Sequence, residues 1–577
     1  MRRLHTLFDP IARAYRSSAW LAVAAATLVG CAAAPASSPT SPASTQTASP
    51  AVTVKVIAIN DFHGNLKPPL GGARIRDPLD RTRLVQVSAG GAEHLATAVA
   101  QLRAQNPNSI FVGAGDLVGA TPLLSALFYD EPTIESLSLM GLDISAVGNH
   151  EFDRGSAELL RLQRGGCHPK DGCKGPKNFT GATFKYLAAS TVDERTGRTV
   201  LPAYEIRRFD GVPIAFIGLT LAATPSIVVP SGVAGLKFRD EAQTVNELVP
   251  QLQRLGVNAF VVLLHEGGFP AGDYNECPGI SGPIVNIVKK LDPAVQVVVS
   301  GHTHRAYNCR IDDKLVTSAD KYGTMLTNMD LTLDRKSGRI TGMRADNVVV
   351  RTEGFAKDAR QTQLIAAYEQ LAQPLAKRVV GRLNSALSSS SNPAGESPLG
   401  RVIADAQLAA TQAPENGGAQ IAFMNPGGIR ASLAPQANGD VRYEDLFAVQ
   451  PFYNNLVTMT LTGAQIVDLL EQQWARQPNA RLLLVSRGFA YTWDAQRPPG
   501  QRVVAGSVTL GGKPLEPQGS YRVTVNSFLA EGGDNFQALR QGAQRRTGVM
   551  DVDALESYIA RGGTAQLDAQ ARITRLN

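Results

Sequence analysis

The chain has 577 residues, of which 44% are apolar and 19% are charged, and its formal net charge is +7. Because one domain typically takes about 100–200 residues, this length excludes a single small binding module and predicts at least two substantial cores. The lysines and arginines are scattered and form no basic tract, so the composition favours small anionic ligands over a nucleic-acid polymer as partner.

The N-terminus is typical of an export signal. Arginines precede an apolar run over residues 20–30, which is shorter than the roughly 20 residues of a membrane-spanning helix. Leu28-Val-Gly-Cys31 resembles the lipobox of bacterial lipoproteins, so we expect a signal peptide over 1–30 and a lipid on Cys31. A plain secretory signal with an incidental cysteine is the alternative. With a lipid anchor the protein is exported and held on the cell envelope, and the non-acidic Ala32 favours the outer membrane, facing the periplasm.

Changes in composition divide the rest of the chain. Residues 31–50 are almost entirely Ala, Pro, Ser and Thr, which cannot bury enough apolar surface to fold, so they predict a disordered tether. Over 51–350, short β-like runs alternate with helical segments, which predicts an α/β layered domain. The helical periodicity near 356–378 predicts a linker helix within 351–379, and the mixed runs over 380–577 predict a second, α+β domain.

Four cysteines remain beyond Cys31, an even number that suits disulfides in an oxidising compartment. Cys167 and Cys173 bracket a loop of Gly, Pro and Lys and are expected to pair locally, which leaves Cys277 with Cys309. No Cys-x-x-Cys pair occurs, and this disfavours a cysteine-based zinc site.

The strongest functional signal is a polar cluster directly after each of five β-like runs, which are 52–59, 109–112, 144–147, 259–264 and 295–299. The clusters are Asn60-Asp-Phe-His63, Gly113-Ala-Gly-Asp116, Gly148-Asn-His-Glu151, His265-Glu-Gly267 and Gly301-His-Thr-His304. Ligand sites of open α/β sheets lie beyond the carboxyl ends of the strands, so a single sheet would gather all five clusters around one crevice.

Five of the eight histidines fall in these clusters, and Asp61, Asp116 and Asn149 accompany them as further potential ligands. A single histidine after a strand is more often a hydrogen-bonded structural residue than a ligand. The combination of imidazole, carboxylate and amide groups, however, is what divalent metal ions require, so the pattern favours a metal site.

These motifs, in this order, resemble those of the calcineurin-like metallophosphoesterases and, among them, the bacterial periplasmic 5'-nucleotidase family. The resemblance extends from about residue 51 to residue 577. It implies an α/β fold with an N-terminal four-layer β-sandwich flanked by helices, followed by a C-terminal α+β domain that binds the substrate. It also implies a hydrolase that acts on phosphoric ester bonds.

By this resemblance, seven side chains hold two divalent metal ions such as zinc or manganese. Asp61, His63 and His304 bind one ion, Asn149, His265 and His302 bind the other, and Asp116 bridges both. A bridging carboxylate holds two ions about 3.5–4 Å apart, where they clamp a phosphoryl group and activate a water molecule. Some family members carry Gln at the position of His304, which leaves the metal preference open.

His150 is expected to act on the substrate rather than on a metal, since Asn149 beside it already supplies an amide ligand. Asp153 resembles the family's partner of this imidazole, which orients the ring and favours its charged form next to developing negative charge. The alternative role for Asp153 is a helix N-cap, where aspartate is strongly preferred.

Substrate-binding residues are expected in the second domain. Arg430 ends the motif Asn-Pro-Gly-Gly-Ile-Arg, whose glycines allow close approach of a ligand, and its guanidinium suits a phosphate. A surface salt bridge is its alternative role. The resemblance assigns Phe452 and Phe528 to the two faces of a nucleobase, Asp534 to the ribose and Asn454 to the nucleoside. For the two phenylalanines, core packing is the alternative.

One departure from the family pattern concerns the phosphate. Relatives place one or two arginines shortly before the Gly-containing start of a helix, whereas residues 387–398 contain none. Arg401 could compensate, although its register differs. The preferred length of the phosphate chain therefore stays open.

The sequence thus predicts an enzyme that hydrolyses extracytoplasmic 5'-nucleotides to nucleoside and phosphate with a two-metal-activated water. A 2',3'-cyclic-nucleotide phosphodiesterase or a nucleotide-sugar hydrolase of the same superfamily is the nearest alternative. A noncatalytic surface-binding lipoprotein is an alternative of another class, and the complete metal set argues against it. The linker helix suits either a hinge for domain rotation or a rigid spacer.

Overall fold

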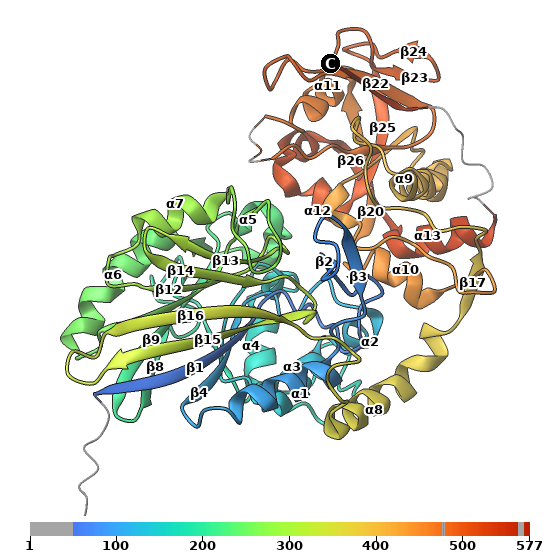
Figure 1. Ribbon diagram of the computed structural model, residues 1–577. Coiled ribbons are helices and arrows are strands. Elements are labelled where there is room, and N and C mark those ends of the chain that lie inside the picture. The colour runs from blue at the N-terminus through green and yellow to red at the C-terminus, as the bar shows by residue number, and fades with distance from the viewer. Residues whose placement is uncertain (1–49, 476, 478, 563–570) are drawn as a thin grey trace, which may run out of the picture. The chain divides into compact units, whose positions relative to one another are not determined.

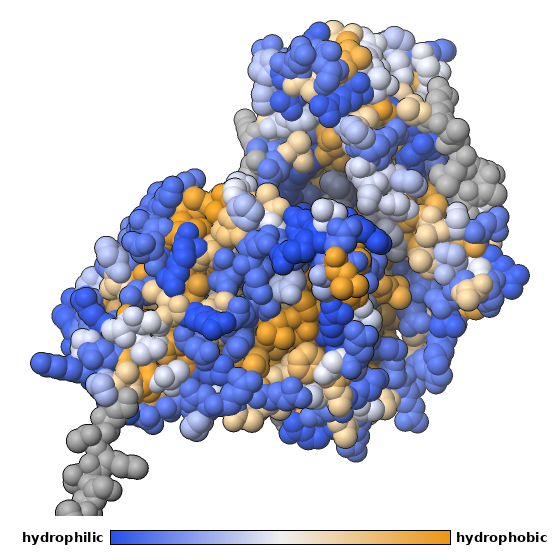
Figure 2. Space-filling view, in the orientation of Figure 1, coloured by the Kyte–Doolittle hydropathy of each residue, from blue (hydrophilic) through white to orange (hydrophobic). Residues whose placement is uncertain are grey.

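The computed structural model describes residues 50–475, 477, 479–562 and 571–577. The predicted signal peptide, Cys31 and all of the predicted tether except its last residue lie outside this range. Within it, none of the helices has the length and apolar character needed to cross a membrane. Hydrophilic side chains predominate on the face shown in Figure 2, where apolar ones form scattered patches. The apolar side chains of the strands therefore lie mainly in the interior.

The N-terminal half is built on two six-stranded sheets (Figure 1). The order in the first is β16 (Ile340–Val349), β15 (Met325–Asp334), β1 (Ala51–Ile59), β4 (Ser109–Ala114), β5 (Ile144–Ala146) and β6 (Lys185–Leu187). The order in the second is β13 (Ala306–Ile311), β14 (Lys314–Ala319), β12 (Val297–Ser300), β11 (Ala259–His265), β9 (Val212–Thr220) and β8 (Tyr204–Phe209). Strands β1, β4, β5 and β6 are parallel, as are β9, β11, β12 and β14.

The alternation of side chains along β1 explains the layering. Val54 and Val56 belong to the apolar cluster between the two sheets, whereas Ile57 points to the opposite face and packs with helices. Helices α1 (Ala92–Arg103), α3 (Glu131–Met140) and α4 (Ser156–Arg164) cover the first sheet. Helices α6 (Glu241–Arg254) and α7 (Pro283–Lys290) cover the second. The result is the predicted four-layer sandwich.

The five strands that precede the polar clusters are divided between the two sheets, so the single sheet expected from the strand pattern alone is wrong and the sandwich implied by the family resemblance is confirmed. Strands β1, β4 and β5 belong to the first sheet, and β11 and β12 belong to the second. Because the two sheets stack face to face, the carboxyl ends of these strands in both sheets still lie at the same end of the sandwich.

The predicted linker helix is α8 (Ala359–Ala376), which packs against α3 and α2 (Leu123–Ala126). Asp358 caps its start by accepting hydrogen bonds from the backbone N–H groups of Arg360 and Gln361. Beside α8, a two-stranded sheet joins β17 (Val379–Arg382) to β19 (Asp440–Arg442). Together these elements lead into the C-terminal domain.

The C-terminal domain mixes sheets and helices, as the sequence predicts. Its five-stranded sheet has the order β21 (Leu484–Val485), β18 (Ile421–Met424), β25 (Ser520–Asn526), β20 (Asn455–Thr462) and β26 (Ala543–Met550). Four further strands form a small sheet in the order β24 (Lys513–Pro514), β23 (Thr509–Leu510), β22 (Phe489–Asp494) and β27 (Ile573–Leu576). Helices α9 (Pro398–Thr411), α10 (Tyr443–Val449) and α13 (Asp551–Ala560) share one apolar cluster, and α11 (Gly463–Glu471) packs in another.

Candidate active site

Two groups of potential metal ligands meet at the end of the sandwich. One group is Asp61, His63 and His304, and the other is Asp116, His265 and His302. Within each group the ligand atoms lie within 4.8 Å of one another. These side chains come from the turns after β1, β4 and β12 and from the last residue of β11.

Asp116 joins the two groups. Its Oδ2 lies 2.9 Å from Nε2 of His265 and 3.7 Å from Nε2 of His63, so one carboxylate oxygen faces a histidine of each group. In the first group, Oδ1 of Asp61 lies 3.2 Å from Nε2 of His304. Asp116 therefore lies between the two groups, where its carboxylate would be within reach of an ion held by either of them.

Several buried polar atoms of the site lack a hydrogen-bond partner among the residues that the structure describes. They include Asn149 Oδ1, and also Asp61 Oδ1 and His265 Nε2, which lie close to charged side chains of the same two groups but form no well-aligned hydrogen bond with them. An unpaired buried polar group costs about 1–3 kcal/mol, so such atoms call for a ligand. Carboxylate, amide and imidazole donors are those that divalent ions bind, and the residues present therefore fit two divalent metal ions of unspecified identity.

Backbone contacts orient the ligands. Nδ1 of His63 lies 2.8 Å from the carbonyl of Gly119, and Nδ1 of His265 lies 2.8 Å from the carbonyl of Ala114. Each ring therefore turns its Nε2 atom toward the centre of the site. Several ligands also have positive φ angles, namely Asp61, His63, Asp116, His302 and His304. Such backbone strain concentrates at functional sites.

The charged groups of the site shift one another's pKa. Burial raises the pKa of Asp61, but His304 and His265 outweigh it and hold the pKa well below its usual range. Burial lowers the pKa of His265, but Asp116 and Asp61 outweigh it and raise the pKa to about 10. For His302, burial and the neighbouring His265 lower the pKa to about 3. The ionised aspartates thus attract positive charge into a buried site.

His150 pairs with Asp153, whose Oδ2 lies 2.7 Å from Nδ1 of the imidazole. Burial lowers the pKa of His150, but Asp153 and Asp116 outweigh it and raise the pKa above its usual value. Asp153 does not cap the start of a helix, because α4 starts at Ser156 and Gly155 is its N-cap. The helix-cap alternative for Asp153 is therefore wrong.

The motif around Asn149 and His150 continues into Glu151, a residue for which the sequence predicts no role. The buried carboxylate of Glu151 accepts hydrogen bonds from the backbone N–H groups of Asp116, Leu117 and Gly148. It thereby ties the turn after β4 to the turn after β5. The sequence feature that could have identified Glu151 is its position at the end of the Gly-Asn-His-Glu motif.

A cavity of about 220 Å³ opens beside the metal ligands. From the N-terminal half, Asn149, His150 and His302 line it. All five side chains predicted to bind substrate line it too, namely Arg430, Phe452, Asn454, Phe528 and Asp534. The structure therefore brings two of the seven predicted metal ligands, Asn149 and His302, and all five predicted substrate residues around one space. Lining residues that the sequence does not predict include Val228, Asn425, Arg481 and Asn526.

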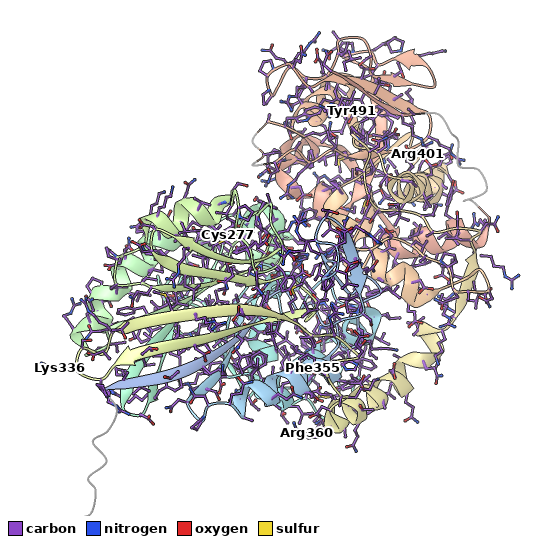
Figure 3. The ribbon with its side chains drawn as sticks, viewed as in Figure 1. Cys277, Lys336, Phe355, Arg360, Arg401 and Tyr491 are labelled. Atoms are coloured by element: carbon purple, nitrogen blue, oxygen red, sulfur yellow. A yellow bond between two sulfur atoms is a disulfide. The ribbon has the colours of Figure 1, made fainter. Side chains whose placement is uncertain are left out.

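Arg430 is partly buried and available to a ligand. Its Nε and Nη2 atoms are buried and have no hydrogen-bond partner among the described residues. The surface salt bridge considered as its alternative role is therefore wrong. Arg401 lies on α9 (Figure 3) and is not one of the residues that line the cavity, so it does not replace the arginines absent from 387–398.

Phe452 and Phe528 are only partly buried, and both rings border the cavity. Core packing alone therefore does not explain them. Arg430 lies over the ring of Phe452, with the guanidinium carbon 5.8 Å from the ring centroid.

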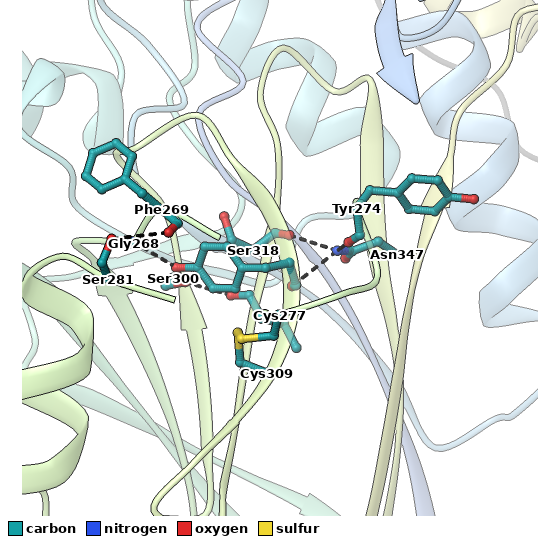
Figure 4. Close-up of a disulfide and its surroundings, with 11 residues drawn as sticks. Gly268, Phe269, Tyr274, Cys277, Ser281, Ser300, Cys309, Ser318 and Asn347 are labelled. Carbon is teal, nitrogen blue, oxygen red and sulfur yellow. Dashed lines mark hydrogen bonds between the residues drawn. A yellow bond between two sulfur atoms is a disulfide. The ribbon is translucent and has the colours of Figure 1, made fainter. Parts of the chain in front are cut away.

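The structure contains both expected disulfides, Cys167–Cys173 and Cys277–Cys309. The second, shown in Figure 4, joins the loop that follows β11 to strand β13. In that loop, the N–H group of Gly268 donates a hydrogen bond to the hydroxyl of Tyr307, two residues before Cys309. The hydroxyl of Thr303 donates to the carbonyl of Gly268. These contacts link the loop to the turn that carries His302 and His304.

Comparisons with known proteins match both halves of the chain. Residues 54–306 match the family of calcineurin-like phosphoesterases, and residues 379–541 match the C-terminal domain of 5'-nucleotidases. The chain is 31% identical over 510 residues to the Endonuclease YhcR of Bacillus subtilis, and the match covers 88% of this chain but only 40% of that protein. It is 30% identical over 547 residues to the cell wall protein Lmo0130 of Listeria monocytogenes, covering 89% of this chain and 68% of that protein. A solved structure of a 5'-nucleotidase precursor from Thermus thermophilus superimposes with a TM-score of 0.73 at 26% identity, covering 91% of this chain and 100% of that chain.

Proposed function

The chain belongs to the family that joins a calcineurin-like phosphoesterase domain to a 5'-nucleotidase C-terminal domain, and we propose that it hydrolyses nucleoside 5'-phosphates to nucleoside and phosphate. The family makes it a hydrolase of phosphoric esters. The cavity supports the proposal that the phosphoric ester is a nucleotide. It brings potential metal ligands and an arginine that has unpaired donors close to two partly exposed aromatic rings. Such a space suits a phosphate joined to a flat base.

In the proposed reaction the ions, when bound, clamp the phosphoryl group and lower the pKa of a water molecule. Arg430 would hold the phosphoryl oxygens through its unpaired donors. Since Nδ1 of His150 is engaged by Asp153, its Nε2–H would donate a hydrogen bond to a phosphoryl oxygen. Asp153 keeps the ring oriented and favours its charged form.

We further propose that the substrate is met outside the cytoplasm, with Cys31 lipidated and the catalytic and substrate domains spanning 51–350 and 380–577. The export-type N-terminus supports this proposal. Charged nucleotides cross membranes poorly, so an exported enzyme would release a nucleoside for uptake.

Hydrolysis of a phosphodiester is a second candidate. Two observations favour it: the arginines that relatives carry before α9 are absent here, and one relative at 31% identity bears the name endonuclease. The experiment below therefore compares a phosphomonoester substrate with phosphodiester substrates.

The test is phosphate release from AMP by the purified full chain, after chelation and again after addition of Mn²⁺ or Zn²⁺. We expect activity that the metal restores and that Asp116→Ala abolishes. Asp346→Ala, which removes an exposed carboxylate on β16, is the matched control and should leave activity unchanged. Turnover of 2',3'-cyclic AMP or a nucleotide sugar without turnover of AMP would replace the proposal with the diesterase. No turnover of any of them would favour a binding protein.

A further inference from the structure

A second group of buried polar side chains lies outside the active-site cavity, where α3, α4 and α8 meet. Glu131 and Glu135 lie one turn apart on α3, and Tyr368 lies on α8, which packs against α3 (Figure 1). The three residues are 1%, 9% and 0% exposed, respectively. None of them lines the cavity or belongs to the two groups of potential metal ligands.

Arg161 of α4 neutralises only part of this group. Its guanidinium donates hydrogen bonds of 2.8 Å to both carboxylate oxygens of Glu158 and one of 2.7 Å to Oε1 of Glu131. Oε2 of Glu131 and both carboxylate oxygens of Glu135 are buried and have no hydrogen-bond partner among the described residues. Burying an unpaired carboxylate oxygen is costly, so these three atoms call for a cation or a proton.

The hydroxyl of Tyr368 is a fourth oxygen at the same place. It too is buried and has no hydrogen-bond partner within the described part of the chain. Burial raises the pKa of this hydroxyl, and the carboxylates of Glu135 and Glu131 raise it further, because the hydroxyl lies close to both. A Cβ added to Gly175, in the loop that follows Cys173, would lie 3.0 Å from the hydroxyl oxygen. The four unpaired oxygens therefore lie close together beneath this loop.

The charges around the group leave it negative. Lys177 of the same loop points a cation at it, but its Nζ lies 3.6 Å from Oε2 of Glu135, too far for a hydrogen bond. The side chain of Lys177 is 63% exposed, so it can turn into the solvent. Without Lys177, the ion pairs of the described residues set three carboxylates, those of Glu131, Glu135 and Glu158, against the guanidinium of Arg161.

A bound cation would give these oxygens a common partner. Carboxylate and hydroxyl oxygens are hard ligands that suit Ca²⁺, which binds about 6–8 oxygen atoms in a flexible geometry. The side chains offer four of them, and water would supply the rest. Mg²⁺ requires a stricter octahedral arrangement. The group contains neither imidazole nor thiolate, the ligands that favour zinc.

We propose that Glu131, Glu135 and Tyr368 form a structural calcium site, separate from the metal ligands of the active site, that links α3 to α8. Because α8 leads from the sandwich toward the C-terminal domain, an ion bound there would fix the start of the connection between the two domains. The proposal does not depend on nucleotide hydrolysis, so failure of either proposal leaves the other standing.

The test is titration of Ca²⁺ into the full chain, measured by isothermal titration calorimetry after chelation and reloading with stoichiometric Zn²⁺. Zinc prefers the imidazole-rich groups of the active site and so keeps Ca²⁺ out of them. We expect one Ca²⁺ per chain with a Kd of about 0.1–1 mM, the range of extracellular calcium modules. Because Ca²⁺ would bind only the folded state, Tm should rise with the concentration of Ca²⁺.

Four variants separate the roles of the side chains. Glu135→Gln keeps the size of the side chain but removes its charge, and should raise the Kd of Ca²⁺ by about tenfold or more. Tyr368→Phe removes one oxygen and should raise the Kd by a smaller factor. Lys177→Gln removes a competing positive charge and should lower the Kd by about threefold or more. The matched control is Glu353→Gln, which removes an exposed carboxylate paired with Arg351 and should leave the Kd unchanged.

Two outcomes would overturn the proposal: no binding of Ca²⁺ by the unmodified chain, or a Kd that is the same in the unmodified chain, Glu135→Gln and Lys177→Gln. The first outcome would mean that the unpaired oxygens hold protons instead. Thermal melting without Ca²⁺ shows whether Glu135→Gln still folds. If it does not, Lys177→Gln decides alone, because its side chain lies on an exposed loop, and an unchanged Kd in that variant would refute the site.

Discussion

The rings of His150 and Phe452 face each other, with their centroids 5.8 Å apart and their planes inclined by 23°. His150 follows β5 in the N-terminal half, and Phe452 follows α10 in the C-terminal domain. The imidazole proposed to donate a hydrogen bond to the phosphoryl group therefore lies directly beside the ring expected to stack on the base.

Replacement of Phe452 by Ala is expected to raise the KM of AMP by roughly 5- to 150-fold, since stacking contributes about 1–3 kcal/mol per base. Phe452→Tyr keeps an aromatic face and should change the KM by less than about threefold. Ribose 5-phosphate has no base, so Phe452→Ala should raise the KM of ribose 5-phosphate much less than the KM of AMP. Equal losses for both substrates would mean that Phe452 acts by positioning His150 instead.

Gly119 is expected to tolerate no side chain. Its φ angle is +82°, and an added Cβ would lie 2.6 Å from the carbonyl of His150 and 2.9 Å from Oδ2 of Asp153. Gly119→Ala should therefore displace this pair and lower the kcat for AMP by about tenfold or more.

The matched control for Gly119 is Gly197→Ala, at a φ angle of +66° where an added Cβ meets nothing within 4 Å. Both substitutions carry the strain of a left-handed alanine, about 1–2 kcal/mol, and thermal melting should show it in both. Only Gly119→Ala should lose kcat. A comparable loss of kcat in both variants would contradict the steric explanation.

The disulfide Cys277–Cys309 is expected to support metal binding. The loop that contains Cys277 contacts the turn that carries His302 and His304, because the hydroxyl of Thr303 donates a hydrogen bond to the carbonyl of Gly268. Replacing both cysteines by Ser should weaken retention of the metal about tenfold or more, as loss of outer contacts around ligands commonly does. Metal content after dialysis against graded chelator, read by mass spectrometry, measures this.

The double Ser variant of Cys167 and Cys173 is the comparison for that experiment. That disulfide closes a loop with a sequence separation of only 6 residues and carries no predicted metal ligand. Both variants should melt at lower temperature. Retention of metal should fall only in the Cys277 and Cys309 variant, and equal retention in the two would refute the link.

Asp551 is expected to make stability depend on pH. Burial raises its pKa to about 7, whereas an aspartate in the unfolded chain has a pKa of about 3.9. Between these values the folded state holds a proton that the unfolded state has lost, so stability falls as pH rises through this range, by at most about 1.4 kcal/mol per pH unit.

Asp551→Asn mimics the protonated side chain and should flatten this dependence, making the variant more stable than the unmodified chain at pH 8. Urea unfolding at pH 5, 6, 7 and 8 measures the effect. Parallel curves for the two proteins would show that Asp551 titrates normally.

Much of the site follows from the sequence because each ligand comes directly after a strand or ends one. The helices over 359–376 and 398–411 also follow from periodicity. The assignment of each strand to one of the two sheets does not follow from periodicity, because a continuous apolar run such as 259–264 is compatible with either sheet. Only the apolar cluster that contains Val54, Phe216 and Val261 shows which strands face each other.

Arg481 could not be predicted either. It lies outside any helix or strand, in a stretch without periodicity, and its partner Asp534 is 53 residues away in the sequence. Pairing of this kind depends on how β18 brings together β21, which follows Arg481, and β25, which precedes Asp534, and no local pattern specifies this. Asp153 differs, because a separation of three residues from His150 already placed the two side chains within reach.

Each of the two ligand groups draws side chains from both sheets: Asp61 and His63 meet His304, and Asp116 meets His265 and His302. Bound ions would therefore cross-link the two sheets. A displacement of one sheet relative to the other would separate ligands in both groups at the same time. The packing of the apolar layer between the sheets therefore influences the geometry of the metal ligands. Val261 is not one of the predicted ligands, but it packs between the sheets and so helps to fix the distance between the ligands on either side. Changes in the packing of this interior would therefore change the affinity for the metal ions.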